Sequence, residues 1–218
     1  MKRALVIGLI LFVLFGFSSV VSGQMTFFLI DNFEDGDLSR NPEWWPFDDI
    51  SPSIVKNVKP TKIDFVAESC GEYSMQIKGN AAQWYVGGLG ANVAIDASEF
   101  TRLQFDVYGN EKGKGKLKIE LYEDDNNNNN IEQDKNKGWA PKFDDIWATE
   151  IAIQGKGFTR YSIPFSAFQD GNPGVGNGKW DPDQKNGSGG LLKVQLIAIA
   201  DSEKGSADFR IDNIILTY

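Results

Sequence analysis

The segment at residues 122–134, "YEDDNNNNNIEQD", places many side-chain oxygens within one short stretch. Oxygen-bearing side chains stand at positions 1, 3, 5 and 7 of a loop counted from its second acidic residue: Asp124, Asn126, Asn128 and Asn130. This alternate spacing is typical of loops that bind calcium through carboxylate and amide oxygens. The twelfth position is Lys135 instead of a glutamate, so the last carboxylate must come from Asp134, Asp144 or Asp145. The pattern predicts either a calcium site that includes Asp145 or an asparagine-rich loop without metal.

Polar and aromatic side chains alternate with apolar ones along two consecutive segments, residues 102–109 and 116–124. In extended strands this alternation sends the apolar set to one face, which comprises Leu103, Phe105, Val107, Leu117, Ile119 and Leu121. The opposite face then carries amide, carboxylate, ammonium and phenol groups from Gln104, Asp106, Tyr108, Lys118, Glu120 and Tyr122. We expect the two segments to be neighbours whose shared polar face matches sugar hydroxyls and ring faces. The alternative is an ordinary solvated sheet face.

The elements that position these residues read as strands. Period-two alternation also marks residues 146–155, 159–165, 194–201 and 208–218, with Gly, Asn, Asp and Pro clusters between them. No segment after the N-terminal apolar run sustains the 3.6-residue period of an amphipathic helix. The sequence therefore predicts an all-β fold, an antiparallel β-sandwich or jelly roll of the galactose-binding-like kind.

The N-terminus has the pattern of a secretory signal peptide. Lys2 and Arg3 precede an apolar run at residues 4–17, and small residues follow as far as Gly23. The run is shorter than the roughly 20 residues that a bilayer-spanning helix needs, which disfavours a permanent anchor. We therefore expect a signal peptide at 1–23, a single β-sandwich domain at 24–218, and a secreted, extracellular or cell-surface protein that does not span the membrane.

Composition excludes several classes of function. The chain has 22 basic and 30 acidic residues, a net charge of −8, and such a surface repels phosphate, so nucleic acid is a poor partner. It contains no histidine, which removes Ser-His and Cys-His nucleophiles and the usual zinc ligands. Cys70 is the single cysteine, so an internal disulfide is impossible.

A second long polar segment, residues 169–190, is rich in glycine. Long glycine-rich loops on a rigid sheet are places where binding specificity can reside. Here Trp180, with Asp181 and Asp183, is expected to form a rim over the sugar cleft. An irregular surface loop is the alternative for most of its length.

Four motifs carry a family resemblance: "LIDNFEDG" at 29–36, "WYVGG" at 84–88, "GFTRYSIPFSAF" at 157–168 and "SADFRIDNIILTY" at 206–218. In order and spacing they resemble the jelly-roll carbohydrate-binding modules of bacterial secreted polysaccharide-degrading systems, most closely family 11, which binds mixed-linkage β-glucan. The resemblance implies a structural calcium that joins the first and last strands through Asp31, Glu34 and Asp212. It also implies a sugar-binding tyrosine at Tyr85, although Ile199 stands where the family has another cleft tyrosine.

Three functions remain open at this point. The first is a non-catalytic module that binds a polysaccharide or cell-surface glycan and is stabilised by calcium. The second is a self-associating structural subunit of a surface layer, sheath or filament, since related jelly rolls also build such assemblies. The third is a glycoside hydrolase, which would need a carboxylate pair such as Asp106 and Glu120 on one sheet face.

Overall fold

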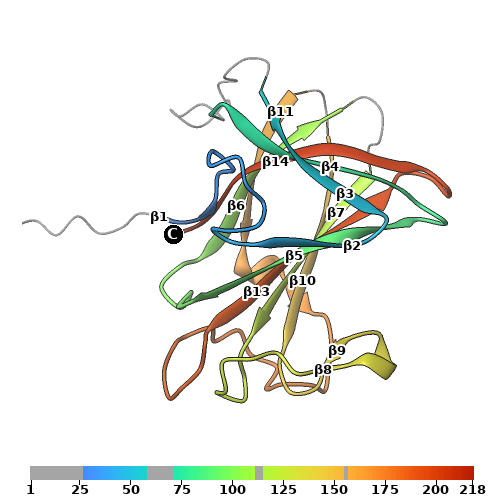
Figure 1. Cartoon of the computed structure of the whole chain (residues 1–218). Helices are drawn as coiled ribbons and strands as arrows, with labels where there is room; N and C mark the ends of the chain where they lie inside the picture. The colour runs from blue at the N-terminus through green and yellow to red at the C-terminus, as the bar shows by residue number, and fades with distance from the viewer. Residues whose placement is uncertain (1–26, 58–70, 111–114, 155–156) are drawn as a thin grey trace, which may run out of the picture.

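The computed structural model describes residues 27–57, 71–110, 115–154 and 157–218. The expected signal peptide at 1–23 and Cys70 lie outside these ranges. Within them the protein is all-β, with two antiparallel sheets packed as a sandwich (Figure 1). The predicted fold class is therefore confirmed.

The first sheet has the strand order β11-β6-β14-β4-β3, with β1 paired to β14. Its strands are β1 (Phe27–Asp31), β3 (Ile50–Lys56), β4 (Tyr73–Asn80), β6 (Arg102–Gly109), β11 (Gly157–Pro164) and β14 (Ser206–Thr217). The antiparallel pairing of β1 with β14 brings the described start of the chain beside its C-terminus (Figure 1).

The second sheet has the order β12-β10-β7-β13-β5-β2. Its strands are β2 (Trp44–Asp48), β5 (Tyr85–Ile95), β7 (Gly115–Glu123), β10 (Ile146–Ala152), β12 (Gln169–Asp170) and β13 (Leu191–Ala200). A short 3-10 helix, η2 (Phe165–Ala167), links β11 to β12.

A small projection follows β7, and we call it the finger. It consists of β8 (Gln133–Asp134), the 3-10 helix η1 (Lys135–Lys137) and β9 (Ala140–Pro141), with β8 and β9 paired antiparallel. Asp134 caps η1, since its side chain accepts a hydrogen bond from the backbone N–H of Asn136, and Gly138 ends it in the left-handed conformation. The tip of the finger is therefore a tight turn, and Trp139 follows this turn directly, just before β9.

The core lies between the two sheets and is built by the predicted alternation. All six side chains expected to point inward from residues 102–109 and 116–124 are buried: Leu103, Phe105, Val107, Leu117, Ile119 and Leu121. Phe209 and Ile211 of β14 and Leu89 of β5 complete the same apolar layer. Among the described residues, no helix has the length and apolarity needed to cross a membrane.

The expectation that residues 102–109 and 116–124 are neighbouring strands with one polar face is wrong. The first segment forms β6 of the first sheet, and the second forms β7 of the second sheet. Their apolar faces meet in the core, so their polar faces point away from each other on opposite sides of the sandwich. Gln104, Asp106 and Tyr108 therefore cannot share a site with Lys118, Glu120 and Tyr122, and Asp106 and Glu120 cannot act as the carboxylate pair of a hydrolase.

Candidate functional site

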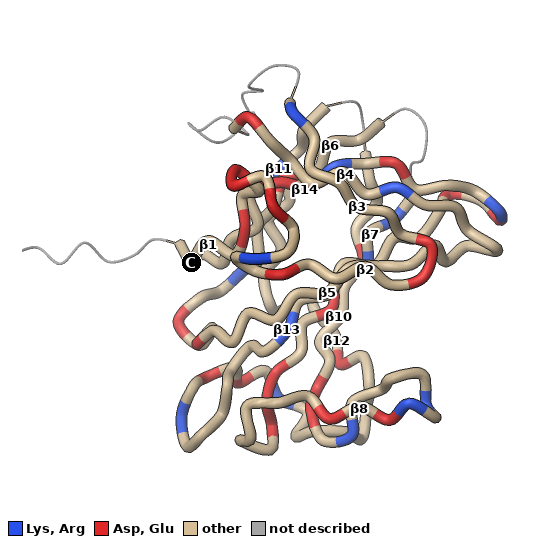
Figure 2. Tube along the Cα trace, in the orientation of Figure 1, with Lys and Arg blue, Asp and Glu red and all other residues tan. Residues whose placement is uncertain are grey.

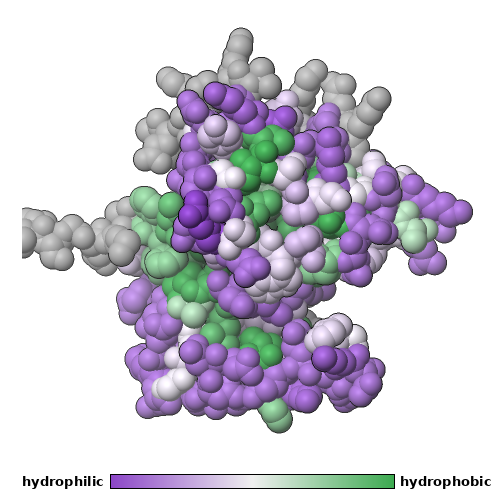
Figure 3. Space-filling view, in the orientation of Figure 1, coloured by the Kyte–Doolittle hydropathy of each residue, from purple (hydrophilic) through white to green (hydrophobic). Residues whose placement is uncertain are grey.

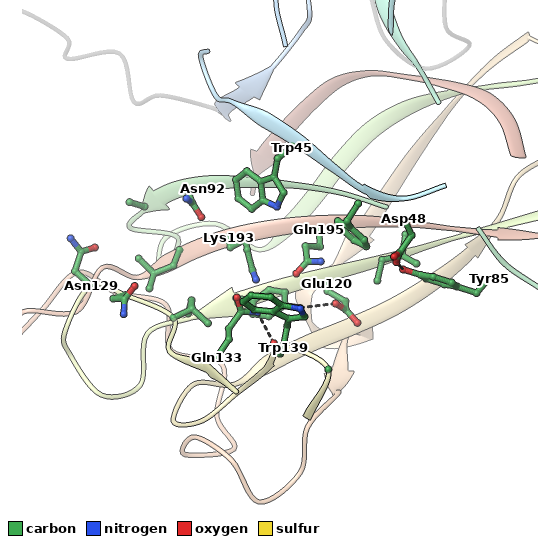
Figure 4. Close-up of a pocket in the computed structure, with 18 residues that line it drawn as sticks. Trp45, Asp48, Tyr85, Asn92, Glu120, Asn129, Gln133, Trp139, Lys193 and Gln195 are labelled. Carbon is green, nitrogen blue, oxygen red and sulfur yellow. Dashed lines mark hydrogen bonds between the residues drawn. The ribbon is translucent and has the colours of Figure 1, made fainter. Parts of the chain in front are cut away.

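The outer face of the second sheet carries a cleft of about 980 Å³. Its floor comes from β2, β5, β7 and β13, and one wall comes from the asparagine run and the finger. The polar and aromatic lining residues are Trp45, Phe47, Asp48, Tyr85, Asn92, Glu120, Tyr122, Asn129, Asn130, Gln133, Trp139, Lys193 and Gln195. Figure 4 shows Lys193 and Gln195 between Trp45 and Trp139, with Asn92 and Asn129 toward one end and Asp48 and Tyr85 toward the other.

Two tryptophans, Trp45 and Trp139, lie on opposite sides of the cleft (Figure 4). Trp45 lies against β5 at Gly90, where an added Cβ would come within 2.6 Å of the indole ring. Glycine at this position lets the ring rest directly on the sheet. Trp139 is 56% exposed and is held by its backbone, since its N–H donates to the Asp134 carbonyl at 3.0 Å and its carbonyl accepts from Gln133 Nε2 at 2.6 Å. An exposed indole on a fixed backbone is a rigid platform with little conformational entropy to lose.

Polar groups on the floor are linked in a chain. Glu120 accepts from the Tyr122 hydroxyl at 2.9 Å and pairs with Lys118 Nζ at 2.7 Å. Lys193 Nζ lies 3.6 Å from the centroid of the Tyr122 ring, a cation–π contact. At the far end the Tyr85 hydroxyl donates to Asp48. These contacts hold the side chains in place, so the hydrogen-bonding groups of the floor are preorganised.

Burial shifts the pKa values of three side chains that line the cleft: Lys193, Tyr122 and Tyr85. Lys193 is 6% exposed, and burial lowers the pKa of its ammonium to about 8, with Glu120 acting in the opposite direction. Burial also raises the pKa of Tyr122 and of Tyr85, each with a neighbouring carboxylate adding to the effect. Both phenols are therefore neutral at physiological pH and can donate or accept hydrogen bonds.

The predicted sugar-binding residues are only partly brought together. Tyr85, Glu120 and Tyr122 line the cleft, and Lys118 supports it through Glu120. Trp180 packs instead between Phe165 at 4.7 Å and Trp147 at 6.2 Å and borders a separate groove with Asp181 and Asp183, so the predicted rim over the cleft is wrong. Asp106 is fully buried in a two-point ion pair with Arg160, which makes it structural.

A cluster of acidic side chains lies where β7 ends and β10 begins, and we call Glu123, Asp125 and Asp145 the acidic cluster. One carboxylate oxygen from each of the three residues lies within 4.8 Å of the other two, and Glu123 and Asp145 are buried. Burial raises the pKa of Glu123 to about 8 and of Asp125 to about 7, and it raises the pKa of Asp145 in the same direction. Oxygen atoms held this close can hold a metal ion. Figure 2 shows several acidic segments near β8 and β12, and Figure 3 shows that this end of the molecule is largely hydrophilic.

The acidic cluster is not the set predicted from the asparagine run. Asp124 instead accepts backbone hydrogen bonds from Asn128, Asn129 and Gly189 at 3.2, 2.6 and 2.8 Å, which closes the loop on itself. The Asn126 and Asn128 side chains both donate to Glu132, and Asn130 lines the cleft. Of the predicted ligands only Asp145 belongs to the acidic cluster. The sequence feature that could have indicated this cluster is the pair of acidic residues two positions apart, Glu123 and Asp125.

The other predicted metal ligands lie near the paired chain ends. Asp212 is fully buried, and its pKa is raised to about 8 by burial, with repulsion from Asp106, Glu34 and Asp31 adding to the effect. Asp31 accepts from the Phe33 N–H at 2.7 Å and from Trp44 Nε1 at 2.8 Å, and Glu34 accepts from the backbone of Glu72 and Tyr73. Among the described residues these three do not converge as tightly as the acidic cluster, so a metal there stays a prediction.

Comparison with known proteins identifies relatives of the fold. No protein-family profile and no curated protein matches the sequence. The fold is similar to a family 11 carbohydrate-binding module from Clostridium thermocellum in complex with a β-1,3-1,4-mixed-linked tetrasaccharide, with TM-score 0.53, 16% identity, and 87% of this chain and 94% of that chain covered.

Two further solved structures show the same likeness. The family 11 module of the cellulosomal cellulase Lic26A-Cel5E of Clostridium thermocellum matches with TM-score 0.52 and 17% identity over 88% of this chain and 94% of that chain. An exo-β-agarase matches with TM-score 0.52 and 15% identity over 87% of this chain and 25% of its own. The predicted resemblance to family 11 modules is therefore confirmed at the level of the fold.

Proposed function

We propose that this protein is a secreted, non-catalytic module that binds a polysaccharide in the cleft on the outer face of the second sheet. The observation that carries the proposal is the pair of indoles, Trp45 and Trp139, on either side of the polar floor residues Lys193 and Gln195 (Figure 4). Aromatic rings match the apolar faces of sugar rings, and amide, carboxylate and ammonium groups match their hydroxyls. A linear glycan fits because polar lining residues lie at both ends of the cleft, Asn92 and Asn129 at one and Asp48 and Tyr85 at the other (Figure 4).

A binding role fits the chemistry better than catalysis. Glu120 is engaged by both Lys118 and the Tyr122 hydroxyl, so it lacks the free, poised carboxyl group that a general acid needs. Asp48, the other acid that lines the cleft, receives the Tyr85 hydroxyl. The fold likeness to carbohydrate-binding modules supports the same conclusion by analogy.

We assign calcium to the metal site because its side-chain ligands are all carboxylate oxygens, which hard cations prefer. Its role is structural, since the acidic cluster faces the loops rather than the cleft floor. A further calcium at Asp31, Glu34 and Asp212 would tie the first strand to the last, and it remains a prediction from the family resemblance.

Native affinity electrophoresis tests the function. The protein is run through gels that contain mixed-linkage glucan, xyloglucan, xylan or mannan, each with calcium and with a chelator. We expect retardation in at least one gel with calcium. If the protein migrates freely in every gel, and glycan arrays also give no signal, the proposal is wrong.

One observation favours the second function, a self-associating surface subunit. Phe27 and Leu29 are 43 and 42% exposed and lie two residues apart on β1, which places them on the same face of that strand. Exposed apolar side chains in one place are typical of protein contacts. Size-exclusion chromatography at rising concentration tests this alternative, which a constant monomer would rule out.

A further inference from the structure

The acidic cluster and the cleft share one segment of chain, residues 122–131. Tyr122 lies on the cleft floor, and the next residue, Glu123, belongs to the acidic cluster. Asp125 follows, and four residues later Asn129 and Asn130 begin the cleft wall. A ligand that holds Glu123 and Asp125 in place would therefore also restrict the position of the cleft wall at Asn129 and Asn130.

The acidic cluster contains oxygens without partners. Asp145 is fully buried and its Oδ1 atom accepts no hydrogen bond, and Asp125 Oδ1 is likewise buried and unpartnered. Among the described residues, none of the ion pairs includes Glu123, Asp125 or Asp145. Burying carboxylates without a positive partner costs much free energy, so a bound cation would stabilise this arrangement.

A glycine turn at residues 174–178 closes over these oxygens. A Cβ atom added at Gly176 would lie 2.3 Å from Asp145 Oδ1 and 2.4 Å from Asp125 Oδ2, so both carboxylates face this turn. Gly178 N–H donates to Asp145 Oδ2 at 2.7 Å, and the N–H of Asp181 donates to Glu123 Oε2 at 2.9 Å. Three separate parts of the chain thus meet at the acidic cluster: the end of β7, the start of β10 and the loop after β12.

The asparagine run is tied to the same place. Asp124, between Glu123 and Asp125, accepts backbone hydrogen bonds from Asn128, Asn129 and Gly189. The N–H of Asp145 also donates to Asp125 Oδ2 at 2.7 Å. Repulsion between unneutralised carboxylates at Asp125 and Asp145 would spread the start of the loop, and a cation would hold it closed.

We propose that Glu123, Asp125 and Asp145 bind one calcium-like divalent cation that holds the asparagine run in position, so that glycan binding in the cleft depends on the cation. The cation site stands on its own, whereas the dependence of glycan binding rests on the proposed function. The cation acts as a positioning element because none of its three ligands lines the cleft.

Calorimetric titration of the chelator-stripped protein with CaCl₂, without glycan, tests the site. We expect Asp145→Asn to remove one binding event or weaken it by about tenfold or more, since one charged ligand is lost. Gly176→Ala should also weaken calcium binding, because the alanine methyl group would occupy the space beside the Asp125 and Asp145 carboxylates. Gly174→Ala is the matched control: Gly174 also has positive φ, +88°, but an added Cβ there has no neighbour within 4 Å. Unchanged calcium binding in both Asp145→Asn and Gly176→Ala overturns the site.

Hydrogen exchange tests the coupling without any glycan. We expect calcium to slow amide exchange across residues 124–133 in the wild type and in Gly174→Ala, but not in Asp145→Asn. Exchange that is the same with and without calcium, in a protein that binds calcium, overturns the coupling.

Affinity electrophoresis then completes the test. Chelator, Asp145→Asn and Gly176→Ala should each weaken retardation by about tenfold or more, the loss expected when a wall of the site is no longer fixed. Full retardation in the chelator also overturns the coupling. If no polysaccharide retards the wild type at all, the proposed function fails, while the titration and hydrogen exchange still decide the cation site and its effect on the wall.

Discussion

The ammonium group of Lys193 lies 3.6 Å from the centroid of the Tyr122 ring on the floor of the cleft. Tyr122 in turn donates its hydroxyl to Glu120, so a cation, a ring and a carboxylate follow one another across two adjacent strands. The ring face attracts the ammonium and offsets part of the free energy lost on its desolvation. The contact keeps a charged hydrogen-bond donor inside a nearly buried floor, where it can meet a sugar hydroxyl.

Lys193→Met should change how stability depends on pH. The pKa of Lys193 is lowered from 10.5 to about 8 by burial. Between these values the unfolded chain keeps the proton and the folded protein releases it, so wild-type stability rises with pH in this window. Methionine has similar length and no charge, so the variant lacks this rise.

Urea unfolding of both proteins from pH 7 to pH 10.5 provides the measurement. The free energy of unfolding of the wild type, minus that of the variant, should increase with pH by at most about 1.4 kcal/mol per pH unit. A constant difference across the window would show that the ammonium is not desolvated.

Trp139→Ala should weaken polysaccharide binding by roughly tenfold or more, the usual effect of removing an aromatic anchor. The free energy of unfolding should change by about 0.5 kcal/mol or less, because the side chain is largely exposed. Trp84→Ala is the control, since Trp84 is 53% exposed and does not line the cleft. Equal loss of binding in both variants, measured by affinity electrophoresis, would place the glycan elsewhere.

The strands were predictable because side-chain alternation is a local property. Leu103 and Leu117 point into the core as their patterns indicate. Which sheet each strand joins was not predictable, since an apolar face looks the same whether two strands lie side by side or face each other across a core. That choice depends on long-range pairing, and β6 pairs with β14 and β11 rather than with β7.

The candidate site was predictable only in part for a similar reason. Tyr85 was predicted from the family resemblance, and Glu120 and Tyr122 from the alternation in residues 116–124; all three line the cleft. The calcium-loop spacing took Asp124 as its first ligand. In the structure the Asp124 carboxylate instead accepts hydrogen bonds from backbone N–H groups of its own loop. Lys193 carries a signal that could have been used, since it is a lone charge within the apolar stretch "LLKVQLIAIA".

Arg160→Ala should destabilise the protein by about 3–5 kcal/mol, because it leaves Asp106 as a buried charge without its partner. Arg160 Nε and Nη2 donate to the two Asp106 oxygens at 2.7 and 2.6 Å. Lys116→Ala removes the exposed pair with Glu150 and should cost less than about 1 kcal/mol. Urea unfolding measures both. Loss of glycan binding by folded Arg160→Ala, without loss of stability, would instead point to a binding face on the first sheet.

Asp124→Ala should loosen the wall of the cleft. The substitution leaves the N–H groups of Asn128, Asn129 and Gly189 without their shared acceptor, and we expect stability to fall by about 1–3 kcal/mol. Hydrogen exchange should become faster at these three amides, and retardation in the polysaccharide gel should weaken because Asn129 lines the cleft.

Asp134→Ala is the matched control for Asp124→Ala, since the Asp134 side chain accepts a single backbone hydrogen bond, from Asn136 at the start of η1. It should speed exchange at Asn136 alone and leave the amides of the asparagine run protected. If Asp124→Ala leaves exchange at Asn128 and Asn129 unchanged, the loop is held by contacts other than its first carboxylate. Calcium at the neighbouring acidic cluster would then have no route through Asp124 to the cleft wall.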